Sequence, residues 1–282
     1  MKLFKTSRGI ILSYNNRNYT LKEDWDKLIN REHLFKYLNN IITNPKSVEK
    51  ASITILEEAK IQAPIGSQEI WAAGVTYLRS RDARMEESKD SGSADFYSKV
   101  YHAERPELFF KATPGRVSAT NEEVFIRRDS KWNVPEPELT LFINSKGKIQ
   151  GYTIGNDMSS RDIEGENPLY LPQAKVYDRC AALGPCLFIN EEPISPETMI
   201  SITIERIDNI VFNNTIQLNR MKRNFTELID YLFRESDFNK GVFLMTGTGI
   251  VPPNDFTLHI GDIVKISIEN IGTLINTVAY KK

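Results

Sequence analysis

Short apolar segments alternate with turn residues along most of the chain after residue 65. Runs of strand length occur at positions 108–111, 124–126, 139–143, 149–154, 185–189, 199–207, 210–212 and 263–268. Gly, Pro and Asn residues separate them, and many short strands divided by turns are typical of a β-rich sandwich or barrel rather than a doubly wound sheet. We therefore predict an α+β, mostly β fold, with a rolled sandwich or barrel over residues 66–282.

The first 65 residues have a different pattern, which predicts a small N-terminal α+β domain over residues 1–65. Positions 10–14 predict a strand, positions 23–40 a charged helix, and a polar connection follows to Pro64, Ile65 and Gly66. In the larger domain, apolar residues recur at helical spacing over positions 218–233 and predict one helix there. We assign no chemistry to the N-terminal domain.

Positions 79–93 are densely charged and predict a short helix followed by a Ser/Gly stretch. Two interpretations stay open. The segment can close over a neighbouring site, exclude water and bring positive charge to an anionic ligand. Alternatively, it is an ordinary exposed helix.

The overall charge is nearly balanced and argues against a polyanionic partner. The chain has 36 Lys and Arg against 37 Asp and Glu, so it has no electrostatic footprint for nucleic acid or an anionic membrane surface. No run of about eighteen apolar residues is present to span a bilayer. We expect a soluble, cytoplasmic protein without nucleic-acid or membrane partners.

Cysteine and histidine chemistry is not indicated. Cys180 and Cys186 are the two cysteines, too few for a disulfide framework. The three histidines, His33, His102 and His259, are scattered, and no zinc motif or Gly-x-Ser-x-Gly motif accompanies them. A zinc site and a Ser-His-Asp arrangement are therefore not predicted.

Two acids two residues apart, Glu136 and Glu138, open an apolar strand in the run PEPELTLFI. Side chains on a strand alternate between its faces, so these two carboxylates point the same way. Like charges this close repel unless one is protonated or a cation lies between them. The pair is a candidate clamp for a divalent metal, or else two solvated acids on an edge strand, where Pro137 would be tolerated.

Asp157 is the candidate third ligand. Gly147 and Lys148 predict a hairpin turn, and the return strand ends just before Asp157. Because the ligands are hard oxygen atoms, the metal would be magnesium, with manganese or calcium as alternatives.

Longer stretches containing these residues resemble the fumarylacetoacetate hydrolase family. They are PEPEL at 135–139, GYTIGNDMSSRD at 151–162 and the tail over 259–276 that begins HIGDIV. The resemblance spans roughly residues 70–282. Within the family, RPELFFKATP at 105–114 and ENPLYLPQAK at 166–175 are most similar to dehydratases of 3-deoxy-2-keto sugar acids.

This resemblance implies a function and a set of site residues. The reaction would be the loss of water from a 2-keto acid substrate, 2-keto-3-deoxy-D-arabinonate, giving 2-oxoglutarate semialdehyde. Glu136, Glu138 and Asp157 would hold Mg²⁺, Lys175 would be the active-site lysine, and Thr248 would touch the substrate carboxylate. A homodimer or homotetramer is also implied, which agrees with the many apolar strands that lack a polar cover.

One departure from the family's hydrolases concerns positions 76–83. Hydrolases of the acylpyruvate type carry a His and a Glu there that activate the attacking water, and this chain has Ser80 and Ala83 in their places. Neither side chain acts as a general base near neutral pH. Elimination needs no activated water, so the departure favours dehydration.

The expected chemistry assigns further roles. Proton loss from C3 would form an enolate, which the cation and the Lys175 ammonium would stabilise, and Lys175 could alternatively remove the proton. Glu107 could exchange a proton with the departing C4 hydroxyl if its pocket raises its pKa, or it could be a structural acid. Candidates to bind the substrate are Lys111, Arg79, Arg84 and Tyr77. Asp162 is expected to pair with Arg161.

Three alternatives remain open at this point. The first is a C–C bond hydrolase of a 2,4-diketo acid that uses a different base. The second is a decarboxylase or tautomerase of the oxaloacetate type, since the same enolate chemistry serves it. The third is a metal-binding β domain without catalysis.

Overall fold

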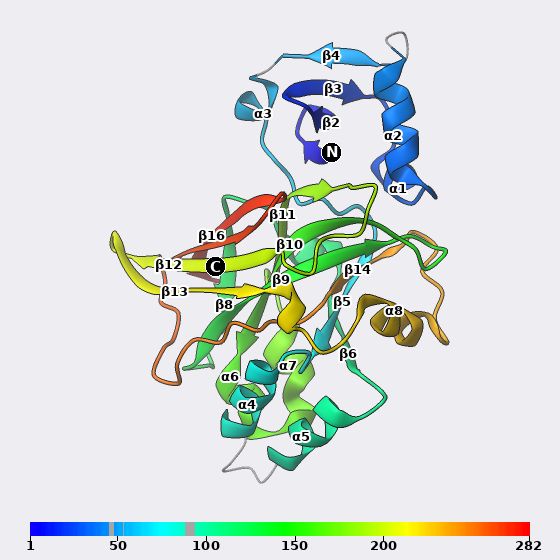
Figure 1. The fold of residues 1–282 in the computed structure, drawn as a ribbon. Helices are drawn as coiled ribbons and strands as arrows, with labels where there is room; N and C mark the ends of the chain where they lie inside the picture. The colour runs from blue at the N-terminus through cyan, green and yellow to red at the C-terminus, as the bar shows by residue number, and fades with distance from the viewer. Residues whose placement is uncertain (45–47, 53, 88–93) are drawn as a thin grey trace.

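The computed structural model of the chain describes residues 1–44, 48–52, 54–87 and 94–282. Within these residues the strands form two sheets, with α4 to α7 at one end and α1 to α3 beside the N-terminal strands at the other (Figure 1). The larger sheet has the order β4-β3-β2-β1-β11-β10-β9-β14-β5-β6, with β7 beside β11, and the smaller has the order β13-β12-β15-β16-β8. The predicted mostly β fold is confirmed.

The strands of the larger sheet are β1 (Lys2–Thr6), β2 (Gly9–Tyr14), β3 (Arg17–Leu21), β4 (Glu49–Ala51), β5 (Glu69–Gly74), β6 (Glu107–Ala112), β7 (Val117–Ser118), β9 (Asn133–Ile143), β10 (Ile149–Ser160), β11 (Ala181–Phe188) and β14 (Val242–Met245). Those of the smaller sheet are β8 (Glu122–Ile126), β12 (Met199–Arg206), β13 (Asn209–Gln217), β15 (Ile263–Ile268) and β16 (Gly272–Tyr280).

The α-helices are α1 (Trp25–Ile29), α2 (Leu34–Thr43), α3 (Ile55–Glu58), α4 (Leu78–Glu87), α5 (Ala94–His102), α6 (Arg161–Glu166), α7 (Leu171–Lys175) and α8 (Phe225–Phe233). Short 3-10 turns are η1 (Pro114–Arg116), η2 (Pro168–Tyr170) and η3 (Leu218–Arg220). No helix among the described residues has the length and apolar character needed to cross a membrane.

The β9–β10 hairpin is the centre of the larger sheet and places most of the chemistry. Every residue of β9 is buried, and so is all of β10 from Gly151 onward. The predicted turn between the strands is confirmed, because Gly147 has a φ of 70° and donates its N–H to the carbonyl of Asn144. Both strands extend beyond the predicted ranges, so that the acidic residues lie inside strands and not at their mouths.

The N-terminal strands continue the larger sheet. Leu3 in β1 pairs with Leu187 in β11, and β2, β3 and β4 follow outward in order. Figure 1 shows this part of the chain above the central strands, flanked by α1 and α2. The division into domains at residue 65 stays a prediction.

Two predicted helices have different limits in the structure. The helix expected over 23–40 is two helices, α1 and α2, because His33 between them has a left-handed φ of 54° that interrupts the helix. The helix expected over 218–233 is α8 alone, which begins where the Asn224 side chain accepts a hydrogen bond from the N–H of Glu227. Leu218 instead opens the 3-10 turn η3.

Candidate active site

Glu136 and Glu138 lie on an interior strand and point to one face of it. β9 is flanked by β10 on one side and β14 on the other, and the two residues are only 4% and 2% exposed. The alternative of two solvated acids on an edge strand is therefore wrong. Carboxylates this deeply buried require positive charge or protons nearby.

Asp157 completes a cluster with these two acids. It lies directly opposite Glu136 in the β9–β10 ladder, while Glu138 faces Gly155. Directly paired residues of an antiparallel ladder share a face of the sheet. One carboxylate oxygen from each of Glu136, Glu138 and Asp157 lies within 4.8 Å of the other two. The structure brings the three predicted ligands together, and their role as ligands stays a prediction.

The proline residues beside the acids fit this interior strand for a local reason. The pairing of β14 with β9 ends at Met245 and Thr140, so Pro135 and Pro137 lie beyond the ladder that their missing N–H groups would interrupt. After β14 the chain continues along the same edge, and the N–H of Gly247 donates to Glu138 Oε2 at 2.6 Å. The edge of β9 that β14 leaves unpaired is thus covered by this loop, and the Gly247 N–H donates to one of the acids.

Gly247 is at this position because no larger residue fits. Its φ is +92°, and a Cβ built there would lie 2.0 Å from Thr76 Oγ1 and 2.9 Å from the carbonyl of Ala73. The following residue, Thr248, is a predicted substrate contact and is 5% exposed. Its hydroxyl donates to the Ile250 carbonyl and accepts from the Ile250 N–H, which fixes the loop beside the cluster.

Two buried lysines neutralise part of the cluster's negative charge. The Lys175 ammonium, at the end of α7, donates to Glu136 Oε2 and lies 3.1 Å from Asp157 Oδ2. Lys111 Nζ, on β6, lies 2.6 Å from Asp157 Oδ1 and also donates to the carbonyls of Met158 and Lys175. All of these partners of Lys111 are protein groups. Its predicted contact with substrate stays a prediction, and its geometry is that of a residue orienting Asp157.

Two arginines approach Glu136 from the other side. Arg161 Nη2 donates to Glu136 Oε1 at 2.6 Å, and Arg84 Nη2 lies 3.6 Å from the same oxygen. Arg161 starts α6, directly after β10, so the turn from strand to helix directs its side chain back toward β9. Both arginines are less than 10% exposed.

The two acids of β9 respond in opposite ways to this environment. Burial alone would raise the pKa of Glu136, but Lys175, Arg161 and Arg84 together hold it well below its usual value. For Glu138, burial and then the negative charges of Asp157 and Glu136 raise the pKa well above its usual value. The site therefore combines a firmly ionised carboxylate with one that gains most from a cation.

Glu107 faces this cluster from the start of β6. It pairs across the ladder with Gly74 at the end of β5, and a Cβ at Gly74 would lie 2.0 Å from Glu107 Oε2. Gly74 therefore makes the room that the Glu107 carboxylate occupies. Burial raises the pKa of Glu107, against the lowering effect of Arg84 and Lys175. This is the condition under which the predicted acid role is possible.

A cavity of about 400 Å³ borders Glu107. Its lining is mainly apolar and comes from α5 and the loop after it, the start of β6, η2 and α7; Figure 1 shows α5 and α7 below the sheet. The lining residues are Phe96, Tyr97, Val100, Ala103, Arg105, Pro106, Glu107, Pro168 and Leu171. Glu107 therefore lines this cavity and also feels the charges of Glu136 and Asp157.

Tyr77 is buried close to the cluster. It is 1% exposed, and its hydroxyl has no hydrogen-bond partner among the described residues. Burial, followed by the charge of Glu138, raises the pKa of this phenol far above its usual value, so it stays a neutral donor. A buried hydroxyl without a protein partner is suited to a ligand.

Arg79 is the predicted site residue that the structure does not connect to the acids. Its side chain is 43% exposed and pairs at 3.8 Å with Glu86 on the same helix, α4. The predicted helix within 79–93 is confirmed by α4, while positions 88–93 lie outside the described residues. Arg79 as a substrate contact stays a prediction.

The expected pair of Arg161 and Asp162 is wrong. Arg161 reaches Glu136, whereas Asp162 accepts from the hydroxyl of Ser130 and the N–H of Lys131. Adjacent helical residues point in different directions, about 100° apart around the axis, so they do not face each other. The strand-to-helix junction after Ser160 was the available signal for this arrangement.

Glu164 is a site residue that the sequence did not single out. It is 1% exposed on α6, accepts from the Ser159 hydroxyl at 2.8 Å and forms an ion pair with Arg84. Its spacing of three from Arg161 puts both side chains on one side of α6. That spacing, following directly on the Asp157 strand, was the signal that could have identified it.

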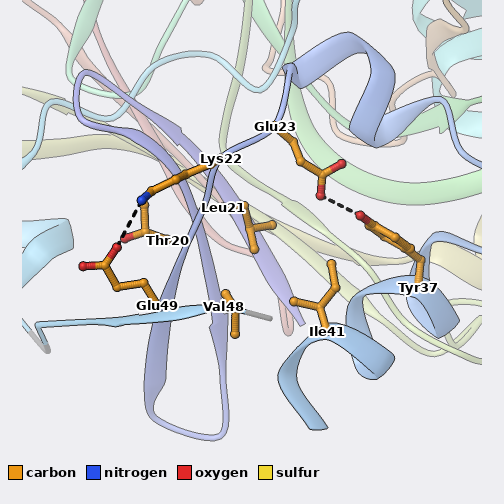
Figure 2. A pocket seen from close by; sticks show the side chains of 8 residues that line it. All are labelled: Thr20, Leu21, Lys22, Glu23, Tyr37, Ile41, Val48 and Glu49. Carbon is orange, nitrogen blue, oxygen red and sulfur yellow. Dashed lines mark hydrogen bonds and ion pairs between the residues drawn. The ribbon is translucent and has the colours of Figure 1, made fainter. Parts of the chain in front are cut away.

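A larger cavity lies elsewhere, between the N-terminal strands and α2. It has a volume of about 650 Å³, and Figure 2 shows the residues that line it. Its polar side chains already pair with one another or with close neighbours, Lys22 with Glu49 and Glu23 with both Arg31 and Tyr37. The Lys22–Glu49 pair is exposed and the pairs of Glu23 are at most partly buried, and no metal-binding group of acids occurs there among the described residues.

The donor set around Glu136, Glu138 and Asp157 fits a hard divalent cation. All three offer carboxylate oxygens, which Mg²⁺ prefers, and no thiolate or imidazole belongs to the group. Burial and the two neighbouring acids raise the pKa of Glu138, and a cation between the three carboxylates would favour its charged form.

Comparisons with known proteins agree with this arrangement. The family description "Fumarylacetoacetate (FAA) hydrolase C-terminal" matches residues 69–279. A probable 2-keto-3-deoxyxylonate dehydratase of Haloferax volcanii is 45% identical over 243 residues, covering 82% of this chain and 83% of that protein. The 2-dehydro-3-deoxy-D-arabinonate dehydratase of Saccharolobus solfataricus is 40% identical over 291 residues, covering 100% and 97%.

A solved structure provides a third comparison. It is a 2-keto-3-deoxy-D-arabinonate dehydratase complexed with magnesium and 2,5-dioxopentanoate, with a TM-score of 0.85 and 37% sequence identity. The match covers 100% of both chains. The similarity therefore includes the N-terminal strands as well as the region around the buried acids.

Proposed function

The chain belongs to the fumarylacetoacetate hydrolase family, and we propose from this premise that it is a sugar-acid dehydratase. It converts 2-keto-3-deoxy-D-arabinonate to 2-oxoglutarate semialdehyde, which is 2,5-dioxopentanoate. The observation that carries this conclusion is the likeness over the whole chain to dehydratases of such acids. The buried cluster of three carboxylates, with Glu107 and Lys175 beside it, supplies the chemistry.

The cofactor is Mg²⁺. We assign its binding to Glu136, Glu138 and Asp157, which supply three of the oxygens it needs, with water and substrate supplying others. When bound, Mg²⁺ acts as a Lewis acid that polarises the 2-keto group and makes the C3 protons more acidic.

The reaction breaks the C3–H and C4–O bonds of the substrate. A base removes the C3 proton, the electron pair forms the C3=C4 double bond, and the C4 hydroxyl leaves as water after it receives a proton. One hydrogen then moves from C5 to C3, and the resulting enol passes its hydroxyl hydrogen to C4. The product is the C5 aldehyde, with all carbons retained and one water lost.

We assign the proton transfers to Lys175 and Glu107. Lys175 is fixed by Glu136 and Asp157, so its nitrogen is positioned either to remove the C3 proton or to stabilise the enolate charge. Glu107 has a raised pKa, which keeps a proton available for the departing hydroxyl. Glu107→Gln should lose most of its turnover without losing Mg²⁺ affinity; full turnover in this variant would exclude the acid role.

The remaining contacts with substrate follow from position. The Tyr77 hydroxyl, buried and without a partner among the described residues, is assigned to a substrate oxygen, and the loop of Thr248 to the carboxylate end. Arg84 adds positive charge next to Glu136. We assign Lys111 to orienting Asp157 and leave Arg79 as a candidate at the surface.

The hydrolase alternative would have to use a base other than the residues at positions 80 and 83. Ser80 donates its hydroxyl to the carbonyl of Tyr77, and Ala83 is fully buried. Neither side chain can activate water. Nothing in the site favours the oxaloacetate-type alternative over dehydration.

A panel of 3-deoxy-2-keto sugar acids, offered with and without EDTA, tests the function. We expect Mg²⁺-dependent formation of a semialdehyde from the five-carbon acid. Release of pyruvate together with a second acid would instead establish C–C hydrolysis. Turnover that persists after complete removal of divalent ions would contradict the assigned cofactor.

We also propose a homodimer or homotetramer. The support is β13, a nine-residue strand at the edge of the smaller sheet that contains no charged residue, Pro or Gly. Ile210 and Val211 on it are 61% and 39% exposed. Such an edge is a template for another strand, and pairing with a second copy places no like charges opposite each other. Val211→Lys should lower the mass measured by light scattering; an unchanged mass would exclude this edge.

The compartment and pathway are proposed in the same way. We place the enzyme in the cytoplasm, in the breakdown of pentose-derived sugar acids. Two buried free cysteines, Cys180 and Cys186, are consistent with a reducing compartment. Cell fractionation with an antibody to the chain tests the location.

A further inference from the structure

Glu164 is a buried carboxylate that the proposed reaction does not use. It is 1% exposed, at the middle of the six-residue helix α6. Burying a carboxylate away from water is unfavourable unless other groups compensate its charge and lone pairs. Two side chains from different elements, Ser159 and Arg84, contact the Glu164 carboxylate, and their positions suggest its role.

The partners of Glu164 connect α4 to the strand that carries Asp157. The Ser159 hydroxyl, two residues after Asp157 on β10, donates to Glu164 Oε2 at 2.8 Å. Arg84 Nη1, on α4, forms an ion pair with Glu164 Oε1. One carboxylate oxygen therefore accepts the Ser159 hydroxyl, and the other forms an ion pair with the guanidinium of a helix far away in sequence.

The same guanidinium reaches the carboxylate cluster with its other end. Arg84 Nη2 lies 3.6 Å from Glu136 Oε1, and the side chain is 7% exposed. A guanidinium is planar and rigid, so fixing one nitrogen also fixes the direction in which the other points. Glu164 thus contributes to fixing where the positive charge of Arg84 lies relative to the cluster.

We propose that Glu164 is a positioning residue: it holds Arg84 so that the guanidinium receives the carboxylate of the 2-keto acid beside Glu136. This proposal rests on the proposed function. Arginine is suited to the task because its fork matches the two oxygens of a carboxylate. Without Glu164, Arg84 keeps its charge but loses the contact that fixes its orientation, and α4 loses a tie to α6.

Steady-state kinetics of Glu164→Gln and Glu164→Asp test the proposal. Contacts between buried charged groups are stronger than neutral ones, so we expect Glu164→Gln to raise KM for the sugar acid about 10-fold or more, with a much smaller change in kcat. Glu164→Asp keeps the charge and should recover part of the loss. Glu166→Gln, an exposed acid on the same helix, is the matched control and should behave as the unmodified enzyme.

A double-mutant cycle separates positioning from general destabilisation. If Glu164 acts through Arg84, Arg84→Ala should raise KM at least as much, and adding Glu164→Gln to it should have little further effect on KM. Fully additive effects would overturn the proposal, as would an unchanged KM in Glu164→Gln. If Glu164→Gln does not fold, an unchanged KM in Arg84→Ala overturns it equally.

Amide hydrogen exchange of α4 without substrate provides a readout that does not depend on the reaction. Exchange over residues 78–86 should be faster in Glu164→Gln than in Glu166→Gln, because the tie between α4 and α6 is lost. Equal exchange in the two variants would overturn the structural half of the proposal. Absence of turnover in the unmodified enzyme would instead overturn the proposed function, while the exchange comparison would still decide the role of Glu164.

Discussion

The carboxylate cluster and the N-terminal cavity contain the same kinds of ion pair in opposite surroundings. Arg161 and Glu136 lie 2.6 Å apart with side chains 2% and 5% exposed, whereas Arg31 and Glu23 lie 2.8 Å apart with side chains 41% and 22% exposed. The distances are nearly equal, so geometry alone does not separate them. Burial does, because charges in a dry interior interact far more strongly than charges that water screens.

The comparison teaches that cavity size is a poor guide to function in this molecule. The larger cavity, shown in Figure 2, has polar groups that satisfy one another at the surface. Around Glu136, Glu138 and Asp157 the ion pairs of the described residues go to Glu136 and Asp157, and burial together with these two acids raises the pKa of Glu138. Perturbed ionisation in a buried group of acids is the better indicator of a site.

The largest expected effect comes from removing one charge of the buried cluster. Glu138→Gln keeps the size of the side chain and an oxygen for the Gly247 N–H, but offers no anionic ligand. Loss of a partner that only touches a metal ligand costs about 10–100-fold in metal affinity, so loss of a ligand should cost at least about 100-fold. Calorimetric titration with Mg²⁺ measures this directly.

The matched control for that variant is Glu49→Gln at the N-terminal cavity. Glu49 is 71% exposed in its pair with Lys22, so Mg²⁺ affinity and turnover should not change. Equal Mg²⁺ affinity in both variants would mean that the buried acids are not the metal ligands.

The second largest effect is expected from filling the space beside Gly74 that the Glu107 carboxylate occupies. Gly74→Ala puts a methyl group 2.0 Å from the present position of Glu107 Oε2, so the carboxyl must move. A displacement of about 1 Å in a reacting group can cost about 100-fold in rate, and we expect kcat to fall by about that factor.

Gly115→Ala is the control for Gly74→Ala, because a Cβ there meets nothing within 4 Å. It should retain full turnover. Gly74→Ala with normal kcat would show that Glu107 need not occupy its observed position, and would count against its assignment as the acid.

A moderate effect concerns pH and stability. The folded chain raises the pKa of Glu107 above the ordinary value of 4.5, so it binds a proton more tightly than the unfolded chain. Stability from this proton is present below that ordinary value and is lost as pH rises toward the raised value. Relative to Glu107→Gln, the unmodified chain should therefore lose stability as pH rises from about 4.5. Thermal unfolding of both proteins in EDTA checks the sign; a parallel pH dependence would contradict it.

The smallest effect is expected at the exposed pair of the N-terminal cavity. Lys22 is 83% exposed and lies 3.5 Å from Glu49, and solvent screens such pairs almost completely. Lys22→Ala should give no measurable change in unfolding temperature or turnover. A clear loss of either would show that this cavity has a role that its contacts do not indicate.

Sequence reasoning located the acids and named Lys175, Lys111 and Arg84, but it did not predict the ion pairs that these cations form with the acids. The two-residue spacing of Glu136 and Glu138 is a property of any strand, and the return strand brought Asp157 within reach, so the cluster could be predicted. The partner of Arg161 could not, because it depends on how α6 leaves β10. Glu164 was missed for the same reason, since its contacts join α4, α6 and β10 in space.

The sequence pattern also could not predict where the helices begin and end. The charged stretch over 23–40 gave no sign of a break at His33, where the backbone turns left-handed, and apolar spacing continued through η3 before Asn224 caps α8. Periodicity reports which face a segment can bury, while caps and positive φ angles decide where it stops.

The short turn between β9 and β10 has an influence that its distance from the acids conceals. Asp157 pairs with Glu136 only because the turn from Asn144 to Lys148, together with the irregularity that follows Ile149, sets the register between β9 and β10. Inserting one residue in the turn would bring Asn156 opposite Glu136, and deleting one would bring Met158 there. The turn acts on this pairing from roughly 30 Å away along the strand. This turn contacts none of the acids, yet it should tolerate changes of residue type and not changes of length. We expect natural variants of this enzyme to differ in the residues of the turn and to keep their number.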